Sequence, residues 1–248
     1  MRLPVLVLIL VGFGLQPEGL ADSPLPKAKP MTNSSMNTFI EGVDVPAGKP
    51  GTDEKSIVPK TEAAGVVASC VLPLVHFEKV ESVSGQTGCG FENAIRMTAV
   101  ETTTGRQVRL STPATISCGF AEILSTWLVT DVIPASETYL GDSLAEITTG
   151  PGYQCRRRNN KPDGKLSEHA LGTAVDIAGF RTLSGGSIDI ESNWAQKTDK
   201  GLFLKAIHKA ACKRFTTVLG PDADPNHKSH FHLDIGCHGK KCTYLICQ

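Results

Sequence analysis

Three of the seven histidines of this chain lie in one short stretch, from His227 to Asp234. This stretch constrains the fold strongly, because alternate side chains of a β-strand point to opposite faces of its sheet. A strand from His230 to Ile235 would place polar side chains on one face, at positions 230, 232 and 234, and apolar side chains on the other face. We therefore expect an apolar side that joins a core and an imidazole-rich side that is free for chemistry.

A second stretch, from Ser167 to Asp176, carries a histidine at position 169 and ends in a carboxylate. Zinc hydrolases hold their ion with three protein ligands of this kind and leave a fourth position open to water. The pKa of such a water falls to about 7, so a hydroxide nucleophile is available at neutral pH. The two stretches together predict a zinc (Zn2+) site with His169, Asp176 and His232 as ligands.

Each of these residues also has a structural interpretation. Asp176 could end a turn or a strand, and His169 could lie in the first turn of a helix that Ser167 caps. His230 and His232 could face solvent on an edge strand. Their joint occurrence in a chain with few histidines favours the metal site over these alternatives.

The first 21 residues are typical of a secretory signal. Arg2 precedes an apolar run from Leu3 to Leu15, and small residues at Gly19 and Ala21 occupy the positions that a signal peptidase reads. The run is shorter than the about 20 apolar residues that cross a bilayer. We expect residues 1–21 to be removed, which leaves no integral membrane segment and a periplasmic or secreted protein.

Residues 22–62 are predicted to form a disordered linker. They include six prolines and show no sustained apolar periodicity, so they cannot bury enough surface to offset the entropy of ordering. The folded domain is expected to span residues 63–248 and to begin with a short helix over residues 63–72.

The eight cysteines are read as disulfides, because an even number in an exported chain favours pairing. The sequence does not choose among the many pairings. The three cysteines after His232 could fasten the C-terminal tail near the predicted strand. A zinc-thiolate cluster is the alternative, and the lack of a Cys-x-x-Cys pair counts against it.

Two amphipathic helices are predicted. Apolar residues recur at helical spacing from Phe120 to Leu128, and this helix should end by Pro134, because proline lacks the N–H group and clashes with the preceding turn. The second helix is expected over residues 203–215, with Cys212 tied down from it. Residues 75–110 are predicted to form strands and turns, with an alternating strand over residues 107–110. The remaining histidines that we leave out of the chemistry are His76, His208 and His238.

The charge balance limits the partners. The chain has 25 Lys and Arg against 25 Asp and Glu, so neither nucleic acid nor an anionic membrane is expected. We expect a monomer.

The pattern Ser167-x-His169-x6-Asp176 followed by His230-x-His232 resembles the zinc peptidases that include D-alanyl-D-alanine carboxypeptidases, dipeptidases and murein endopeptidases. The region from Cys70 onward resembles more closely the bacterial extensin-like C-terminal domain family. The motifs that carry this resemblance are Gly88-Cys89-Gly90, Cys118 with Trp127, Tyr153 to Arg156, Leu166 to Ala170, Asp176 to Phe180, Ala211-Cys212, Val218 to Pro221 and His227 to Asp234.

The peptidase resemblance implies a fold and a role for each matching residue. The implied fold is α+β, with a small central antiparallel sheet of about four strands, helices packed on one side, zinc in a groove on the sheet and disulfide staples. The same three ligands would bind zinc, and Ser167 and Tyr153 would bind substrate. Arg156 would polarise the scissile carbonyl group, with Arg157 and Arg158 as nearby alternatives.

One position departs from the dipeptidase pattern. That branch has a glutamate as general base three residues before the last ligand, where this chain has Ser229. The endopeptidase branch has histidines at the positions of His230 and His227. An imidazole can take the proton of water if its pKa stays near the working pH, so we expect His230 to act as the base or transition-state donor and His227 to assist.

The resulting prediction is an exported zinc-dependent peptidase that acts on peptidoglycan cross-links or stem peptides. The alternative, which the serine at position 229 favours, is a non-catalytic module for cell-wall binding or signalling that zinc stabilises.

Overall fold

The structure, a computed structural model, describes residues 70–80, 82–86 and 88–248. The predicted signal segment and linker lie outside these residues, as does most of the predicted helix over residues 63–72. The last three residues of that span, Cys70 to Leu72, are described and are not helical.

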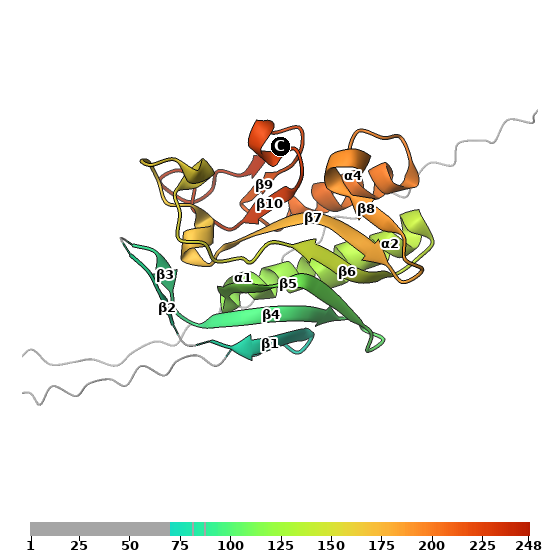
Figure 1. The fold of residues 1–248 in the computed structure, drawn as a ribbon, viewed down its shortest axis with the longest axis horizontal. Helices are drawn as coiled ribbons and strands as arrows, with labels where there is room; N and C mark the ends of the chain where they lie inside the picture. The colour runs from blue at the N-terminus through green and yellow to red at the C-terminus, as the bar shows by residue number, and fades with distance from the viewer. Residues whose placement is uncertain (1–69, 81, 87) are drawn as a thin grey trace, which may run out of the picture. The chain divides into compact units, whose positions relative to one another are not determined.

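A mixed sheet of nine strands forms the centre of the domain (Figure 1). Most neighbouring strands are antiparallel, but two pairs, β5 with β6 and β9 with β11, run parallel. In spatial order the strands are β1 (Val75–Lys79), β4 (Ala94–Glu101), β5 (Gln107–Ser117), β6 (Leu144–Thr149), β7 (Ala174–Thr182), β10 (Phe231–Asp234), β9 (Thr217–Leu219) and β11 (Ile246–Cys247), with β8 (Ser187–Asp189) paired to β7.

The α+β class and the mostly antiparallel pairing are therefore as predicted, but the sheet is larger than the small sheet of about four strands that was predicted, and it includes two parallel pairs. Strands such as β8, β9 and β11 contain only two or three residues. Two or three residues are too few to show an alternation of apolar and polar side chains. The sequence pattern therefore predicted only longer strands. A separate hairpin of β2 (Val83–Ser84) and β3 (Gly90–Phe91) lies outside the main sheet.

The first amphipathic helix is longer than predicted. The chain runs without a break through α1 (Cys118–Trp127), a π-helical turn over Leu128–Val132, and α2 (Ile133–Leu140). Pro134 directly follows the π-helical turn, where the backbone hydrogen bonds run from residue i to residue i−5, as from the Ile133 N–H to the Leu128 carbonyl oxygen. The prediction that the helix ends by Pro134 was wrong because this change in hydrogen-bond pattern lets the helical run continue past a residue that has no N–H group.

This helical run, Cys118–Leu140, is also long and apolar enough to cross a membrane by length and composition alone. Its apolar side chains, however, belong to the domain core: Phe120, Leu124 and Trp127 are at most 1% exposed. Core helices pass the same test, so the run is weak evidence for a membrane span.

One apolar core joins the helices to the sheet. The other two α-helices are α3 (Ile190–Asn193) and α4 (Asp199–Ala211). The latter confirms the second predicted helix, but it starts and ends four residues earlier than predicted. The Trp127 indole N–H donates to the Ile207 carbonyl oxygen at 3.2 Å, and the Trp127 ring lies 5.8 Å from the Phe215 ring. Full burial of each such side chain contributes about 1.5–3 kcal/mol.

All eight cysteines form disulfides, which confirms the disulfide prediction and leaves no thiolate for a zinc cluster. Cys212, just after α4, is tied down as predicted, and its partner is the C-terminal Cys247, a pairing that the sequence did not specify. The four bridges are Cys70–Cys118, Cys89–Cys155, Cys212–Cys247 and Cys237–Cys242.

Candidate metal centre

The centre is built on the pairing of β7 with β10. The two strands are antiparallel, and His232 lies directly opposite Asp176. Residues directly opposite each other in a sheet share a face, so the imidazole and the carboxylate project to the same side. Their neighbours Phe231 and Ile177 are fully buried in the core. The predicted division of β10 into an apolar and a chemical face is confirmed.

His169 reaches the same point from a short 3-10 helix, Glu168–Leu171. Ser167 caps this helix, because its Oγ accepts a hydrogen bond from the His169 backbone N–H. Gly172 ends it with a left-handed backbone (φ +67°), which returns the chain to β7. His169 is only 2% exposed, and its Nε2 lies 3.2 Å from Nδ1 of His232.

Three donor atoms converge in this way. Oδ1 of Asp176 lies 2.9 Å from Nδ1 of His232 and 3.2 Å from Nε2 of His169. Ligand atoms around a tetrahedral zinc ion, at about 2.0–2.1 Å from the metal, are separated by about 3.3 Å. The triangle fits the donor set and spacing that zinc requires, and it joins the three residues that the sequence predicted as ligands.

The outer nitrogen of each imidazole is held by an acceptor. Nδ1–H of His169 donates to the Gly152 carbonyl oxygen at 2.7 Å, and Nε2–H of His232 donates to Oδ2 of Asp234 at 3.0 Å. With those protons fixed, the inner nitrogens keep their lone pairs for a metal. Gly152 itself has a left-handed backbone (φ +76°), and a Cβ there would lie 2.5 Å from the Thr115 carbonyl oxygen, so glycine is needed to place the acceptor.

Asp234 is a part of the centre whose role the sequence did not reveal. Its carboxylate is 4% exposed, and Oδ1 accepts a hydrogen bond from the Gly236 backbone N–H at 2.8 Å. The strand pattern did place Asp234 on the face of His232. The sequence signal that could have revealed its role is the spacing between His232 and Asp234. Residues two positions apart on a strand lie on the same face, where their side chains can contact each other.

The electrostatics of the cluster favour a bound cation. Burial tends to raise the pKa of Asp176, but hydrogen bonds to His169 and His232 outweigh it and hold that pKa well below its usual range. Burial tends to lower the pKa of His232, but hydrogen bonds to Asp176 and Asp234 raise it to about 9. In the absence of metal, the two carboxylates therefore stabilise the protonated form of His232. A metal ion bound at the triangle would replace that proton.

The two other histidines of the predicted site stand beside the triangle. Nε2 of His230 lies 3.7 Å from Oδ1 of Asp176, and burial lowers the pKa of His230, which favours the neutral imidazole. His227 is 9% exposed and donates Nδ1–H to Oδ2 of Asp224 at 2.9 Å. Asp224 is fixed in turn by the Asn226 backbone N–H at 2.7 Å. Sequence reasoning missed Asp224, which precedes a 3-10 turn and carries no pattern of its own.

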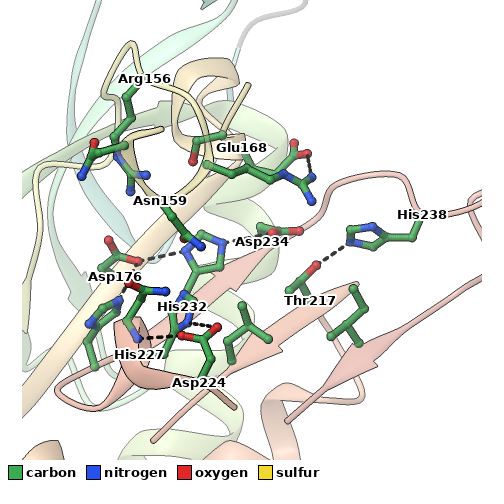
Figure 2. Close-up of a pocket in the computed structure, with 17 residues that line it drawn as sticks. Arg156, Asn159, Glu168, Asp176, Thr217, Asp224, His227, His232, Asp234 and His238 are labelled. Atoms are coloured by element: carbon green, nitrogen blue, oxygen red, sulfur yellow. Dashed lines mark hydrogen bonds and ion pairs between the residues drawn. The ribbon is translucent and has the colours of Figure 1, made fainter. Parts of the chain in front are cut away.

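A cavity of about 440 Å³ opens over these residues (Figure 2). One wall comes from a loop that carries Arg156, Arg158 and two asparagines, and the opposite wall comes from β9 and the C-terminal tail. Nε of Arg156 donates to Oε1 of Gln154 at 2.9 Å, and Arg158 forms an ion pair with Glu168 at 3.2 Å. Both asparagines, Asn159 and Asn160, have left-handed backbones.

A family model described as the extensin-like protein C-terminus matches residues 69–248. The chain belongs to this family. The match confirms the resemblance to the extensin-like family, and it includes every strand, disulfide and site residue described above. No curated protein and no solved structure matches this extensin-like chain. The resemblance to zinc peptidases stays a prediction.

The other residues that were predicted to bind substrate or polarise it have different positions in the extensin-like domain. Ser167 lines the cavity, but it is 3% exposed and its Oγ serves as the helix cap. Tyr153 packs against Phe91 with ring centroids 5.7 Å apart and does not line the cavity. Arg157 donates to the Gly164 carbonyl oxygen, and of the three neighbouring arginines it alone does not line the cavity.

The three histidines that were left out of the chemistry have different places. His76 pairs with Glu101 at 2.9 Å, and His208 contacts the Gln248 carbonyl oxygen at 3.1 Å, both away from the cavity. His238 lines the cavity and is hydrogen-bonded to Oγ1 of Thr217 at 2.6 Å (Figure 2). It therefore belongs to the surroundings of the site, a position that the sequence did not indicate.

Proposed function

We propose that this extensin-like domain is a zinc-dependent peptidase that acts on the peptides of peptidoglycan. The observation that carries the proposal is the triangle of donor atoms from His169, Asp176 and His232, with both outer imidazole nitrogens held by acceptors. Histidines that bind a metal almost always have their other ring nitrogen held by such an acceptor.

The three residues would hold zinc at the floor of the cavity. When bound there, zinc supplies Lewis-acid chemistry and brings the pKa of a water ligand to about 7. The protein contributes the orientation of the ligands and the exclusion of bulk water, because the floor is largely buried: the side chains of His169 and His232 are 2% and 12% exposed.

Two imidazoles are available to move a proton. His230 has a lowered pKa and stands next to the triangle, so its neutral form can accept a proton from water or return one to a leaving amine. His227 has its Nδ1 proton fixed by Asp224, so its Nε2 is the free nitrogen. Asp224 is a positioning residue in this proposal, since it acts only through His227.

The wall of the cavity provides groups that suit a peptide. The Arg156 guanidinium makes one hydrogen bond to Gln154 through Nε, which leaves its terminal nitrogens to polarise a scissile carbonyl group. The carboxamides of Asn159 and Asn160 can donate to and accept from peptide groups. A volume of about 440 Å³ lies within the range of small-ligand sites.

The test uses the full-length chain loaded with zinc and incubated with purified sacculi, followed by chromatography of the soluble products. We expect release of muropeptides by the wild type and none by His232→Ala. His76→Ala is the matched control, because His76 lies away from the cavity. Absence of release by zinc-loaded wild type, or equal release by His232→Ala, would refute the proposal.

A non-catalytic zinc-stabilised module for cell-wall binding or signalling is the second candidate. The specific observation in its favour is that position 229 is a serine, and that every carboxylate among the described residues lining the cavity already has a histidine or arginine partner. Glu168, which lines the cavity, is engaged by Arg158 and by Oγ1 of Thr173 at 3.0 Å. Tight binding of sacculi without release of products, unchanged in His230→Ala, would support this candidate over the first.

A further inference from the structure

Two loops, each tied by a disulfide, flank the cavity. Residues 155–165 form the first loop, whose first residue is bridged to Cys89 beside β3. Residues 237–242 form the second loop, which is closed by its own bridge. The first loop contributes Arg156 and the second contributes His238 to the cavity lining, and Figure 2 shows these two side chains at separate edges of the site. We call the two loops together the basic rim.

The basic rim concentrates positive charge in a chain whose charges otherwise balance. It contains seven Lys and Arg residues and one acidic residue, Asp163, whereas the whole chain has 25 of each sign. The seven are Arg156, Arg157, Arg158, Lys161, Lys165, Lys240 and Lys241.

This charge is largely unneutralised. Among the residues that the structure describes, Arg158 is the one rim cation that forms an ion pair, with Glu168. The acidic residues of the cavity floor, Asp176, Asp224 and Asp234, have histidines and not rim cations as their partners. Lys161, Lys165, Lys240 and Lys241 are all exposed to solvent.

We propose that the basic rim binds an acidic peptide strand laid across the cavity, with carboxylates contacting both loops. This inference rests on the proposed function, since it names the substrate class of the same site. Carboxylates on either side of the bond in the cavity would meet Arg or Lys groups on both edges, and such contacts orient a chain as well as attract it.

The composition of the rim favours a peptide over other anions. Residues 155–165 and 237–242 contain no Phe, Tyr or Trp and no large aliphatic side chain. Single-stranded nucleic acids are bound largely by stacking on aromatic rings, and membrane surfaces by an apolar face beside the cations. Instead, the first loop turns two carboxamides, those of Asn159 and Asn160, toward the cavity, where they can pair with backbone amides.

The test measures binding of a fluorescent peptide of alternating alanine and glutamate to the full-length chain, by anisotropy at low and at high salt. A peptide with glutamine in place of glutamate is the ligand control. We expect the Lys161→Glu/Lys165→Glu and Lys240→Glu/Lys241→Glu variants each to bind at least about tenfold more weakly, with a shallower salt dependence. Lys197→Glu/Lys200→Glu is the matched protein control. Both lysines are exposed near the start of α4 and neither lines the cavity of the candidate site.

The outcomes separate this inference from the proposed function. Binding and hydrolysis are both measured for the zinc-loaded wild type, and binding also for His232→Ala. A wild type that binds the acidic peptide but hydrolyses nothing upholds the inference while the peptidase proposal fails. Equal affinity for the glutamine peptide, or affinity unchanged by both rim variants, overturns the inference. Stronger binding to phosphatidylglycerol vesicles or to a single-stranded oligonucleotide than to the acidic peptide also overturns it.

Discussion

His232 and Asp234 lie two residues apart on one face of β10, with Nε2 of the imidazole 3.0 Å from Oδ2 of the carboxylate. On its other side the same ring places Nδ1 2.9 Å from Oδ1 of Asp176. The imidazole is thus held between two carboxylates, one on the outer side of the centre and one within the donor triangle. The outer carboxylate decides which nitrogen carries the proton, and hence which nitrogen faces a metal.

Asp234→Asn should weaken zinc binding without unfolding the domain. The amide keeps the size of the carboxylate but removes its charge, so it holds the His232 ring less firmly. We expect a loss of about 10–100-fold in zinc affinity, measured by competition with a chelating dye. Asp222→Asn, a change to an exposed carboxylate paired with Lys205, serves as the control. An unchanged affinity would mean that Asp234 does not support a metal ligand.

His169→Ala should abolish zinc binding. The side chain supplies one of the three corners of the triangle and is almost fully buried, so its removal leaves only two of the three ligands. We expect elemental analysis to give one zinc per wild-type chain and none in the variant after dialysis against a weak chelator. His76→Ala should retain the metal. Equal zinc content in all three proteins would place the metal elsewhere or nowhere.

The stability of the metal-free protein should fall as the pH rises from about 6.5 to about 9. His232 has a folded-state pKa of about 9 against an ordinary value of 6.5, so its stabilising proton is fully present below pH 6.5 and is lost as the pH passes 9. The loss amounts to about 3 kcal/mol for a shift of this size. The lowered pKa of Asp176 has the opposite sign, since its contribution is present above pH 3.8 and is lost in acid.

Urea unfolding of the chelator-treated protein between pH 5 and pH 10 measures this effect. The zinc-loaded protein should not show the decline above pH 6.5, because the metal takes the place of the proton and binds more tightly as the proton leaves. Parallel curves for the two forms would contradict the proposed exchange. His232→Ala, which has no such proton, should be insensitive to pH over the same range.

Asp224→Asn should slow hydrolysis and leave zinc content unchanged. The carboxylate fixes the Nδ1 proton of His227, and without it the ring can rotate or change tautomer. Because general acid-base catalysis contributes about 10²–10⁴-fold, we expect kcat to fall by about 10-fold or more with little change in KM. Asp224→Glu should restore part of the rate, and a nitrogen-15 spectrum of the histidines should show the changed tautomer. A normal rate together with a changed tautomer would exclude His227 from proton transfer.

The parts of this site that were predictable are those with local signals. The alternation after His230 predicted a strand with one chemical face, and the helical spacing from Phe120 predicted a core helix; both are confirmed. The two histidine-bearing stretches predicted His169, Asp176 and His232 as one set, and the structure brings them within contact of one another.

The parts that were not predictable depend on long-range pairing. The opposition of Asp176 and His232 follows from the register of β7 against β10, which no local pattern specifies. The same holds for the cysteine pairs and for the short strands that enlarge the sheet. Asp224 and Asp234 resemble ordinary loop and strand-end residues in the sequence, and only their contacts with histidines reveal what they do.

The disulfides should differ in their contributions to stability, according to the length of chain that each one closes. Cys89 and Cys155 are 66 positions apart, whereas Cys237 and Cys242 are 5 apart. In the chain-entropy model, loss of the first bridge costs about 4 kcal/mol and loss of the second about 2 kcal/mol. Double alanine variants of each pair, compared by urea unfolding, measure the difference.

The same two variants distinguish stability from function, because each bridge also fixes one loop of the basic rim. Cys237→Ala/Cys242→Ala frees the loop that carries Lys240 and Lys241 while removing the less stabilising bridge. We therefore expect this variant to stay folded and bind zinc but to bind acidic peptide more weakly, since a loop that is no longer closed pays more entropy on binding. If it bound the peptide as tightly as the wild type, the closure of the loop would serve stability alone.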